Sequence, residues 1–467
     1  MPILCKLHYS PRVILLLTTL ASMLNPFIST SVQVALPSIA RELSLDNYMT
    51  GWIALSYIVV SAVLLIPFGK MADRRSHGTL FVLGLLLFSI ANLFCFMAHS
   101  LPFLLTFRIV KGVGGALIYA TAIPILTRAY PDSQRGLVIG INLSAVSFSL
   151  LAGPLLGGFI INYLGWRYLF LIVGLIAFGT LLGAVGLRNT NRAETPQKHY
   201  DYIGAFIYIP AIALLILGLT RLSAYTEPFS GTVQDILPRL LLPVAIILLI
   251  LFFVYERHRD NAILATDLLT YNRRFLLASL AAWAAYGADF TVNYMLSFWL
   301  QRSAGLPSHL TGLVLMSQPL AMMLLSPFAG IWSDKIGEHK VVLIGSFIMM
   351  CGFILLALIH EHTPIWYIVV AELCMGCGFG VFLSPNVSML MGSVSKDKAG
   401  TASAMLASMR QIGQSTGLSM AMLVATLIPG TSSVDTTHST YTVMRISLVL
   451  MLICVITSLF CRKEIHK

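Results

Sequence analysis

Five charged side chains stand inside long apolar stretches of this sequence: Arg108, Lys111, Asp289, Glu372 and Arg410. A charged residue at the centre of a membrane-spanning helix costs about 2.5–3.5 kcal/mol on insertion scales, so such residues normally face a polar cavity or an ionic partner. With a rise of about 1.5 Å per helical residue, Lys111, Asp289 and Arg410 fall near the middle of their stretches. These five residues are therefore the first candidates for binding or for proton transfer.

Proton transfer requires a group that can change its charge inside the protein. Burial favours the neutral form of a carboxyl group, whereas a nearby cation favours the ionised form. Asp289 is therefore the leading candidate for a proton-coupling residue, Glu372 is the second, and Arg108 is the basic residue that we include with them. The alternative is structural, because either acid could form a permanent ion pair with a buried cation.

Polar residues recur at helical spacing in three of the apolar stretches. A face that lines a cavity should repeat every three or four residues. The three stripes are Thr18, Ser22, Asn25, Ser29 and Gln33; Tyr286, Asp289, Asn293 and Ser297; and Ser403, Ala407, Arg410 and Gln414. We expect a shared substrate cavity whose lining includes Asn25, Ser29, Gln33, Lys111, Tyr286, Asn293, Arg410 and Gln414.

The elements that must hold these residues are membrane-spanning helices. The sequence is 57% hydrophobic and 10% charged, with a mean hydropathy of +0.84, whereas soluble domains carry about 25% charged residues. A span needs about 20 apolar residues. Fourteen such stretches begin near Arg12, Met49, Gly78, Pro102, Gly136, Trp166, Tyr202, Leu237, Phe275, His309, Lys340, Pro364, Lys398 and Tyr441.

The spacing of these stretches predicts an all-α membrane protein with two six-helix bundles and two linker transmembrane helices. The expected boundaries are 1–187 for the first bundle, 188–273 for the linker and 274–467 for the second bundle. The first stretch, from Arg12 to Leu36, is longer than the apolar core of a signal peptide and lacks a small-residue cleavage site, so it is read as a span.

Orientation follows from the loops, because short cytoplasmic loops carry an excess of Lys and Arg. Most of the 30 basic residues lie in loops on the side of the N terminus. The opposite side holds Arg41, Arg167, Arg221, Arg239, Arg302 and Arg445. We therefore expect a multi-pass protein of the bacterial inner membrane with both termini in the cytoplasm. The net charge of +11 reflects this bias and gives no reason to expect nucleic acid as a partner.

No catalytic or metal-binding pattern accompanies the buried charges. Cys374 and Cys377 lie within an apolar stretch without nearby His, and His360 and His362 have the wrong spacing for ligands on one helix face. The sequence also lacks a phosphate-binding Gly-Lys-Ser/Thr loop. We expect no enzyme activity, no metal and no cofactor, and an ion gradient as the source of energy.

Two loops at matching positions of the two bundles share a pattern of glycine, an acid four residues later, and a base. The residues are Gly69, Asp73 and Arg74 in one loop and Gly330, Asp334 and Lys335 in the other. A carboxylate at a helix end can accept hydrogen bonds from helix amides and pair with basic neighbours. The loops could therefore form a conformational latch, or the charges could simply be solvated.

The fifth stretch contains a kinked, small-residue face formed by Gly153, Pro154, Gly157 and Gly158. Small residues allow two helices to approach closely. The face therefore predicts either close packing that seals one side of a cavity or helix packing with no role in coupling.

These motifs resemble those of the major facilitator superfamily, in particular its drug:proton antiporter branch with fourteen spans. The resemblance covers nearly the whole chain and includes Ala35-Leu36-Pro37, the loop from Gly69 to Gly78, Arg108 to Gly115, the Gly153–Gly158 antiporter motif and Arg410-Gln411-Ile412-Gly413. Three positions depart from the family pattern: Ser76 replaces glycine, Lys111 replaces glutamine, and Ile28 replaces an acid.

The buried charges and the resemblance together predict a proton-coupled antiporter that exports small amphipathic organic molecules by alternating access. Protons, a small-molecule substrate and membrane lipids would be its partners, and a monomer is expected. One alternative is a specific transporter of an anionic metabolite, such as a carboxylate siderophore, working as an importer. A more distant alternative is a membrane sensor that does not transport. Lys111 together with Ile28 adds a cation and removes an anion, which favours anionic or zwitterionic cargo over lipophilic cations.

Overall fold

The computed structural model describes residues 9–74, 76–189, 201–222, 233–257, 269–270, 272–360, 362–394, 399–427 and 433–461. In these ranges all regular secondary structure is helical, as expected. The α-helices are α1 (Pro11–Glu42), α2 (Asn47–Arg74), α3 (His77–Phe96), α4 (Leu101–Ala129), α5 (Asp132–Tyr163), α6 (Arg167–Ala184), α7 (Tyr202–Thr220), α8 (Val233–Glu256), α10 (Arg273–Phe298), the short α11 (Ser308–Leu315), α12 (Ser317–Ile336), α13 (Glu338–Ala357), α14 (Ile365–Met391), α15 (Ala399–Leu427) and α16 (Ser433–Phe460).

Fourteen membrane-spanning elements follow from these helices, and the expected fold class is confirmed. Thirteen segments of the described chain are long and apolar enough to cross a membrane, with α11 and α12 joined in one segment, Ser308–Ile336. The fourteenth element is α15, which has 29 residues and is less apolar because it carries Arg410, Gln411 and Gln414. Most helices begin within a few residues of the expected positions, but α16 begins earlier, at Ser433.

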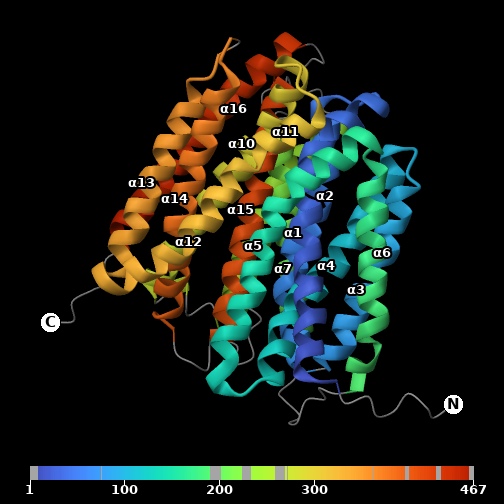
Figure 1. Cartoon of the computed structure of the whole chain (residues 1–467), viewed down its shortest axis with the longest axis vertical. Coiled ribbons are helices and arrows are strands. Elements are labelled where there is room, and N and C mark those ends of the chain that lie inside the picture. The colour runs from blue at the N-terminus through green and yellow to red at the C-terminus, as the bar shows by residue number, and fades with distance from the viewer. Residues whose placement is uncertain are drawn as a thin grey trace.

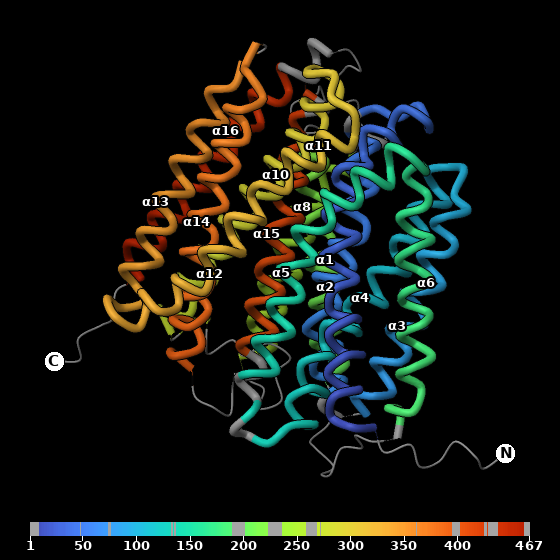
Figure 2. Tube along the Cα trace, in the orientation of Figure 1, coloured from blue at the N-terminus to red at the C-terminus, as the bar shows by residue number. Residues whose placement is uncertain are grey.

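Two bundles stand side by side, one built from α1–α6 and the other from α10–α16 (Figure 1). The end of the molecule at which α1 ends is called the outer end below, and the end at which α1 begins is called the inner end. The tube in Figure 2 shows that α5 approaches α11 at the outer end, whereas α5 and α12 diverge towards the inner end.

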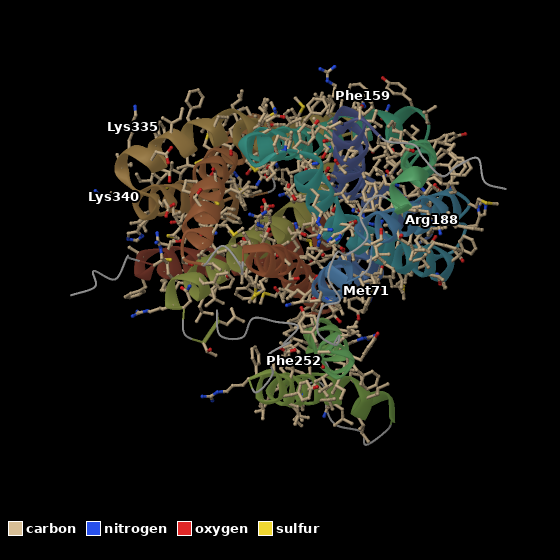
Figure 3. The ribbon with its side chains drawn as sticks, turned by 90° about the horizontal axis from the view of Figure 1, so that it is seen from below. Met71, Phe159, Arg188, Phe252, Lys335 and Lys340 are labelled. Atoms are coloured by element: carbon tan, nitrogen blue, oxygen red, sulfur yellow. The ribbon has the colours of Figure 1, made fainter. Side chains whose placement is uncertain are left out.

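The linker helices α7 and α8 form a hairpin outside the two bundles, as the view along the molecule in Figure 3 shows. The hairpin is held together by apolar contacts such as that between the rings of Tyr208 and Phe252, whose centroids are 5.3 Å apart. An apolar pocket lies where the hairpin meets α2 and α15, and its lining includes Ile66, Leu249 and Met405. This pocket contains none of the buried charged residues.

Among the described residues, the hydrogen bonds between the two bundles lie at the outer end. Ser297 Oγ on α10 donates to Gln33 O on α1 at 2.7 Å, and Gln301 Nε2 donates to Val34 O at 2.8 Å. Ser38 Oγ lies 3.5 Å from Ser308 Oγ. The bundles are therefore joined by polar contacts on the side away from the start of α1.

Candidate functional site

Asp289 lies in the middle of α10 and is held by two side-chain amides. Its Oδ1 accepts a hydrogen bond from Asn293 Nδ2 at 3.0 Å and another from Gln318 Nε2 on α12. Asn293 Nδ2 also donates to Gln318 Oε1 at 3.1 Å. Asn293 is one helical turn after Asp289, so both project on the same face of α10. The carboxyl group is thus fixed without any cation bonded to it in the described part of the chain.

Glu372, on α14, is the second intramembrane acid of the C-terminal bundle. The residue is 0% exposed, and neither Oε1 nor Oε2 has a hydrogen-bond partner among the described residues. A buried unpartnered carboxylate is costly, whereas the neutral acid loses much less on burial. The described structure therefore supplies no donor that would stabilise an ionised Glu372.

Arg410, on α15, lies over an aromatic ring rather than beside an acid. Its guanidinium carbon is 5.3 Å from the centroid of the Tyr286 ring, and its buried Nε has no hydrogen-bond partner in the described structure. The Tyr286 ring in turn contacts the ring of Phe379 at 5.6 Å between centroids. Tyr286, Asp289, Arg410 and Gln414 are all partly accessible, in contrast to the fully buried side chains around them. These residues of α10 and α15 could line a cavity.

Arg108 and Lys111, on α4, point into the N-terminal bundle. They are 2% and 1% exposed. Lys111 Nζ lies 4.9 Å from the ring centroid of Tyr57, 5.3 Å from that of Phe88 and 5.8 Å from that of Phe170. These rings come from α2, α3 and α6. Lys111, which was expected at the substrate cavity, is therefore enclosed by the helices of its own bundle.

The structure keeps the intramembrane acids and bases apart. Within the described ranges no ion pair joins Asp289 or Glu372 to Arg108, Lys111 or Arg410. Ion pairs form at helix ends instead, between Arg167 and Glu42 at 2.5 Å and between Arg274 and Glu338 at 2.8 Å. The structural alternative, a permanent pair between the buried charges, is not present in this conformation.

The polar stripe of α1 divides between two environments. Asn25 is buried and its Oδ1 accepts a hydrogen bond from the Tyr57 hydroxyl at 2.6 Å, so it faces the N-terminal bundle. Gln33 lies at the outer contact with α10, where its backbone carbonyl is bonded to Ser297. Ser29, between them, is partly accessible. The stripe therefore runs from the interior of one bundle to the contact between the two.

The small-residue face of α5 lies between α1 and α11. Ser31 Oγ on α1 donates to Gly153 O at 2.8 Å, and a Cβ at Gly157 would lie 2.7 Å from Ser31 Cβ. On the other side, a Cβ at Gly158 would lie 2.6 Å from Ser308 O, and one at Gly312 would lie 2.1 Å from Pro154 O. Glycine is required at these positions because the helix backbones touch.

The two latch loops form no ion pair in the described structure. The side chains of Asp73 and Arg74 lie outside the described part, although their backbone ends α2. Asp334 and Lys335 are exposed, and Lys335 points away from the bundles in Figure 3. A Cβ at Gly69 would meet no atom within 4 Å, and one at Gly330 would meet only Ser384 Oγ at 3.9 Å. A latch role for these residues remains a prediction.

Sequence reasoning missed Gln318, Tyr57 and Gln301. Each is a polar residue within an apolar helix, and that isolation was the available signal. Their importance comes from contacts with other helices: Gln318 bonds Asp289, Tyr57 bonds Asn25, and Gln301 bonds Val34. In the described part of the chain no group of three His, Cys, Asp or Glu residues is placed to hold a metal ion.

Comparisons with known proteins identify relatives of the whole molecule. The model of the Major Facilitator Superfamily matches residues 18–256 and 278–466. The riboflavin transporter RibZ of Clostridioides difficile is 26% identical over 408 residues, which cover 87% of this chain and 86% of the relative. The multidrug resistance protein Stp of Mycobacterium tuberculosis is 26% identical over 430 residues, which cover 89% of this chain and 78% of the relative.

Two solved structures show the same fold. A bacterial homologue of the human lysosomal transporter Spinster, in an inward-facing and unoccupied conformation, matches with a TM-score of 0.66 and 15% identity over 98% of both chains. A POT family transporter in complex with 5-aminolevulinic acid matches with a TM-score of 0.70 and 15% identity over 96% of both chains.

Proposed function

The chain belongs to the Major Facilitator Superfamily and is a multi-pass membrane transporter rather than an enzyme. We propose that it is a proton-coupled antiporter that exports small amphipathic organic molecules. The observation that carries the proposal is the position of Asp289. A carboxyl group held by the amides of Asn293 and Gln318 can gain or lose a proton without breaking an ion pair. Asp289 is therefore assigned the coupling role, and Glu372, which is buried and unpartnered, is the second acid.

Alternating access is supported by the distribution of contacts between the bundles. Hydrogen bonds join them at the outer end, and α5 and α12 diverge at the inner end (Figure 1). In the proposal, residues 1–187 and 274–467 move as two halves around the central residues, and residues 188–273 link them. The Gly153–Gly158 face closes the outer side, and the loops at Asp73 and Asp334 act as latches at the inner side. The inner side is the cytoplasm of a bacterial cell, which contains both termini.

The proposed cargo is amphipathic because the accessible central residues combine rings with charge. Tyr286, which is partly accessible, offers aromatic surface beside Arg410, and aromatic surface together with one polar group suits planar organic molecules. The names of the relatives, which include a multidrug resistance protein and a riboflavin transporter, are consistent with such cargo. The protein works as a monomer with protons and lipids as its other partners.

A second function, transport of a specific anionic metabolite in the import direction, is favoured by one observation. Arg108 and Lys111 are buried in the N-terminal bundle without an acidic partner in the described structure. In this case Arg108 would bind the anionic cargo instead of taking part in proton coupling. The sign of the cargo charge therefore separates the two candidates.

The test is transport by purified protein in liposomes with an imposed pH gradient and a panel of cationic, neutral and anionic compounds. Asp289→Asn should abolish transport driven by the gradient and leave cargo exchange without a gradient within about threefold, because the amide mimics the neutral acid. Asp46→Asn is the matched control, since Asp46 is exposed and caps α2 through Met49 N at 2.6 Å. Full gradient-driven transport by Asp289→Asn would remove Asp289 from the coupling role.

A further inference from the structure

Two cations are buried side by side in the N-terminal bundle. Arg108 and Lys111 are three residues apart on α4 and so project on one face of the helix. Both are at most 2% exposed, and Arg108 Nε and Nη1 have no hydrogen-bond partner in the described structure. Two like charges in a low-dielectric interior repel each other and also lose their hydration, so they require a compensating negative charge.

The N-terminal bundle has no acid that could supply this charge. Its sequence contains four carboxylate side chains: Glu42, Asp46, Asp73 and Asp132. All four stand at or beside helix ends, and Glu42 is bonded to Arg167 and Trp166. The two intramembrane acids of the C-terminal bundle form no ion pair with either cation in the described structure. A charge that compensates Arg108 and Lys111 in their ionised forms therefore comes from outside the polypeptide.

The aromatic rings around Lys111 compensate only in part. Tyr57, Phe88 and Phe170 surround its ammonium group at 4.9–5.8 Å, and each cation–π contact is worth about 0.5–2 kcal/mol. The penalty for burying an ion is several kcal/mol even after relaxation, and here two ions are buried. Because Arg108 and Lys111 are buried behind these rings, the site suits a compact anion better than a large one.

We propose that Arg108 and Lys111 form a binding site for one compact anionic group within the N-terminal bundle. The group is either the carboxylate of the cargo or a free inorganic anion such as chloride, since both carry a single negative charge that a guanidinium and an ammonium can share. For the carboxylate source, the inference rests on the second function proposed above, transport of an anionic metabolite, and names the group of the cargo that is bound. For the inorganic source, it is independent of transport.

The test measures equilibrium binding of radiolabelled chloride and of radiolabelled benzoate, as a small carboxylate, to the full-length protein in detergent micelles. Ionic strength is held constant with gluconate, which is bulkier than either labelled anion, at the same concentration for every variant. We expect saturable binding of about one anion per protein, weakened at least tenfold in Lys111→Gln. Lys340→Gln removes an exposed lysine and is the matched control, which should bind as the wild-type protein does.

Each outcome decides the proposal. Saturable binding of chloride alone assigns an inorganic anion, and binding of benzoate assigns the carboxylate of an organic cargo. Absence of saturable binding by the wild-type protein overturns the site and indicates that Lys111 is buried as an uncharged amine. If Lys111→Gln does not fold, Arg108→Lys provides the second variant, because it keeps the charge and loses the forked donors; unchanged affinity in the variant that folds also overturns the site. Since no gradient is applied, failure of proton-driven transport would leave these results unaffected.

Discussion

Replacing Gly312 by alanine should open the contact between the bundles at the outer end. An alanine Cβ at this position of α11 would lie 2.1 Å from Pro154 O and 3.0 Å from Pro154 C on α5. Backbone atoms cannot move aside as a flexible side chain can, so the two helices must separate by about 1 Å to restore van der Waals contact. Overpacking of this kind typically costs about 1–3 kcal/mol. The cost falls on the conformation in which α5 and α11 touch.

A penalty of that size shifts the equilibrium between outer-closed and outer-open conformations by roughly 5–150-fold. The assay is a distance measurement between spin labels at positions 164 and 310, whose side chains are exposed near the outer ends of α5 and α11, in a background without native cysteines. Gly312→Ala should populate a longer distance. The matched control is Gly140→Ala, also on α5, where a Cβ would meet no atom within 4 Å. An unchanged distance distribution in a folded Gly312→Ala protein would refute the reasoning.

Two further predictions concern the ends of the helices. Glu42→Gln should lower the free energy of unfolding by about 0.5–1 kcal/mol, because the half-exposed Glu42 accepts a hydrogen bond from Trp166 Nε1 at 2.7 Å and pairs with Arg167. Thermal unfolding at low and high salt measures this loss, and a loss that does not depend on salt would contradict the ionic contribution. For orientation, Ser44→Cys should react with an impermeant thiol reagent from outside the cell and Lys340→Cys only after permeabilisation, and the reverse pattern would invert the topology.

The helices were predictable from sequence because each must be long and apolar enough to cross the membrane. In lipid, backbone polar groups must be bonded within the segment, so each span is a helix of about 20 apolar residues. The bounds of α7 illustrate this, since a single apolar stretch defines it. The start of α16 at Ser433 was missed because its first turns, which include Asp435 and His438, are polar.

The neighbours of the buried charges could not be predicted in the same way. Helical spacing puts Arg108 and Lys111 on one face of α4, but the sequence does not show which helices cover that face. The covering rings belong to Phe88 on α3 and Phe170 on α6, far away in sequence. The bond between Asp289 and Gln318 likewise depends on how α10 packs against α12. Such contacts depend on how the helices pack against one another, and this packing cannot be derived from a single sequence.

The charge state of Asp289 gives anionic and cationic cargo opposite signatures. Asp289 is neutral when protonated and negative when ionised, so an anionic cargo binds better to the protonated protein and a cationic cargo binds better to the ionised one. By linkage, each cargo shifts the proton in the reciprocal direction: an anion promotes proton uptake, as import with a proton requires, and a cation promotes proton release, as antiport requires. The measurement is the pH change of a weakly buffered solution when cargo is added to the purified protein. The pH change should disappear in Asp289→Asn. A pH change of equal size in that variant would show that another group takes up or releases the proton.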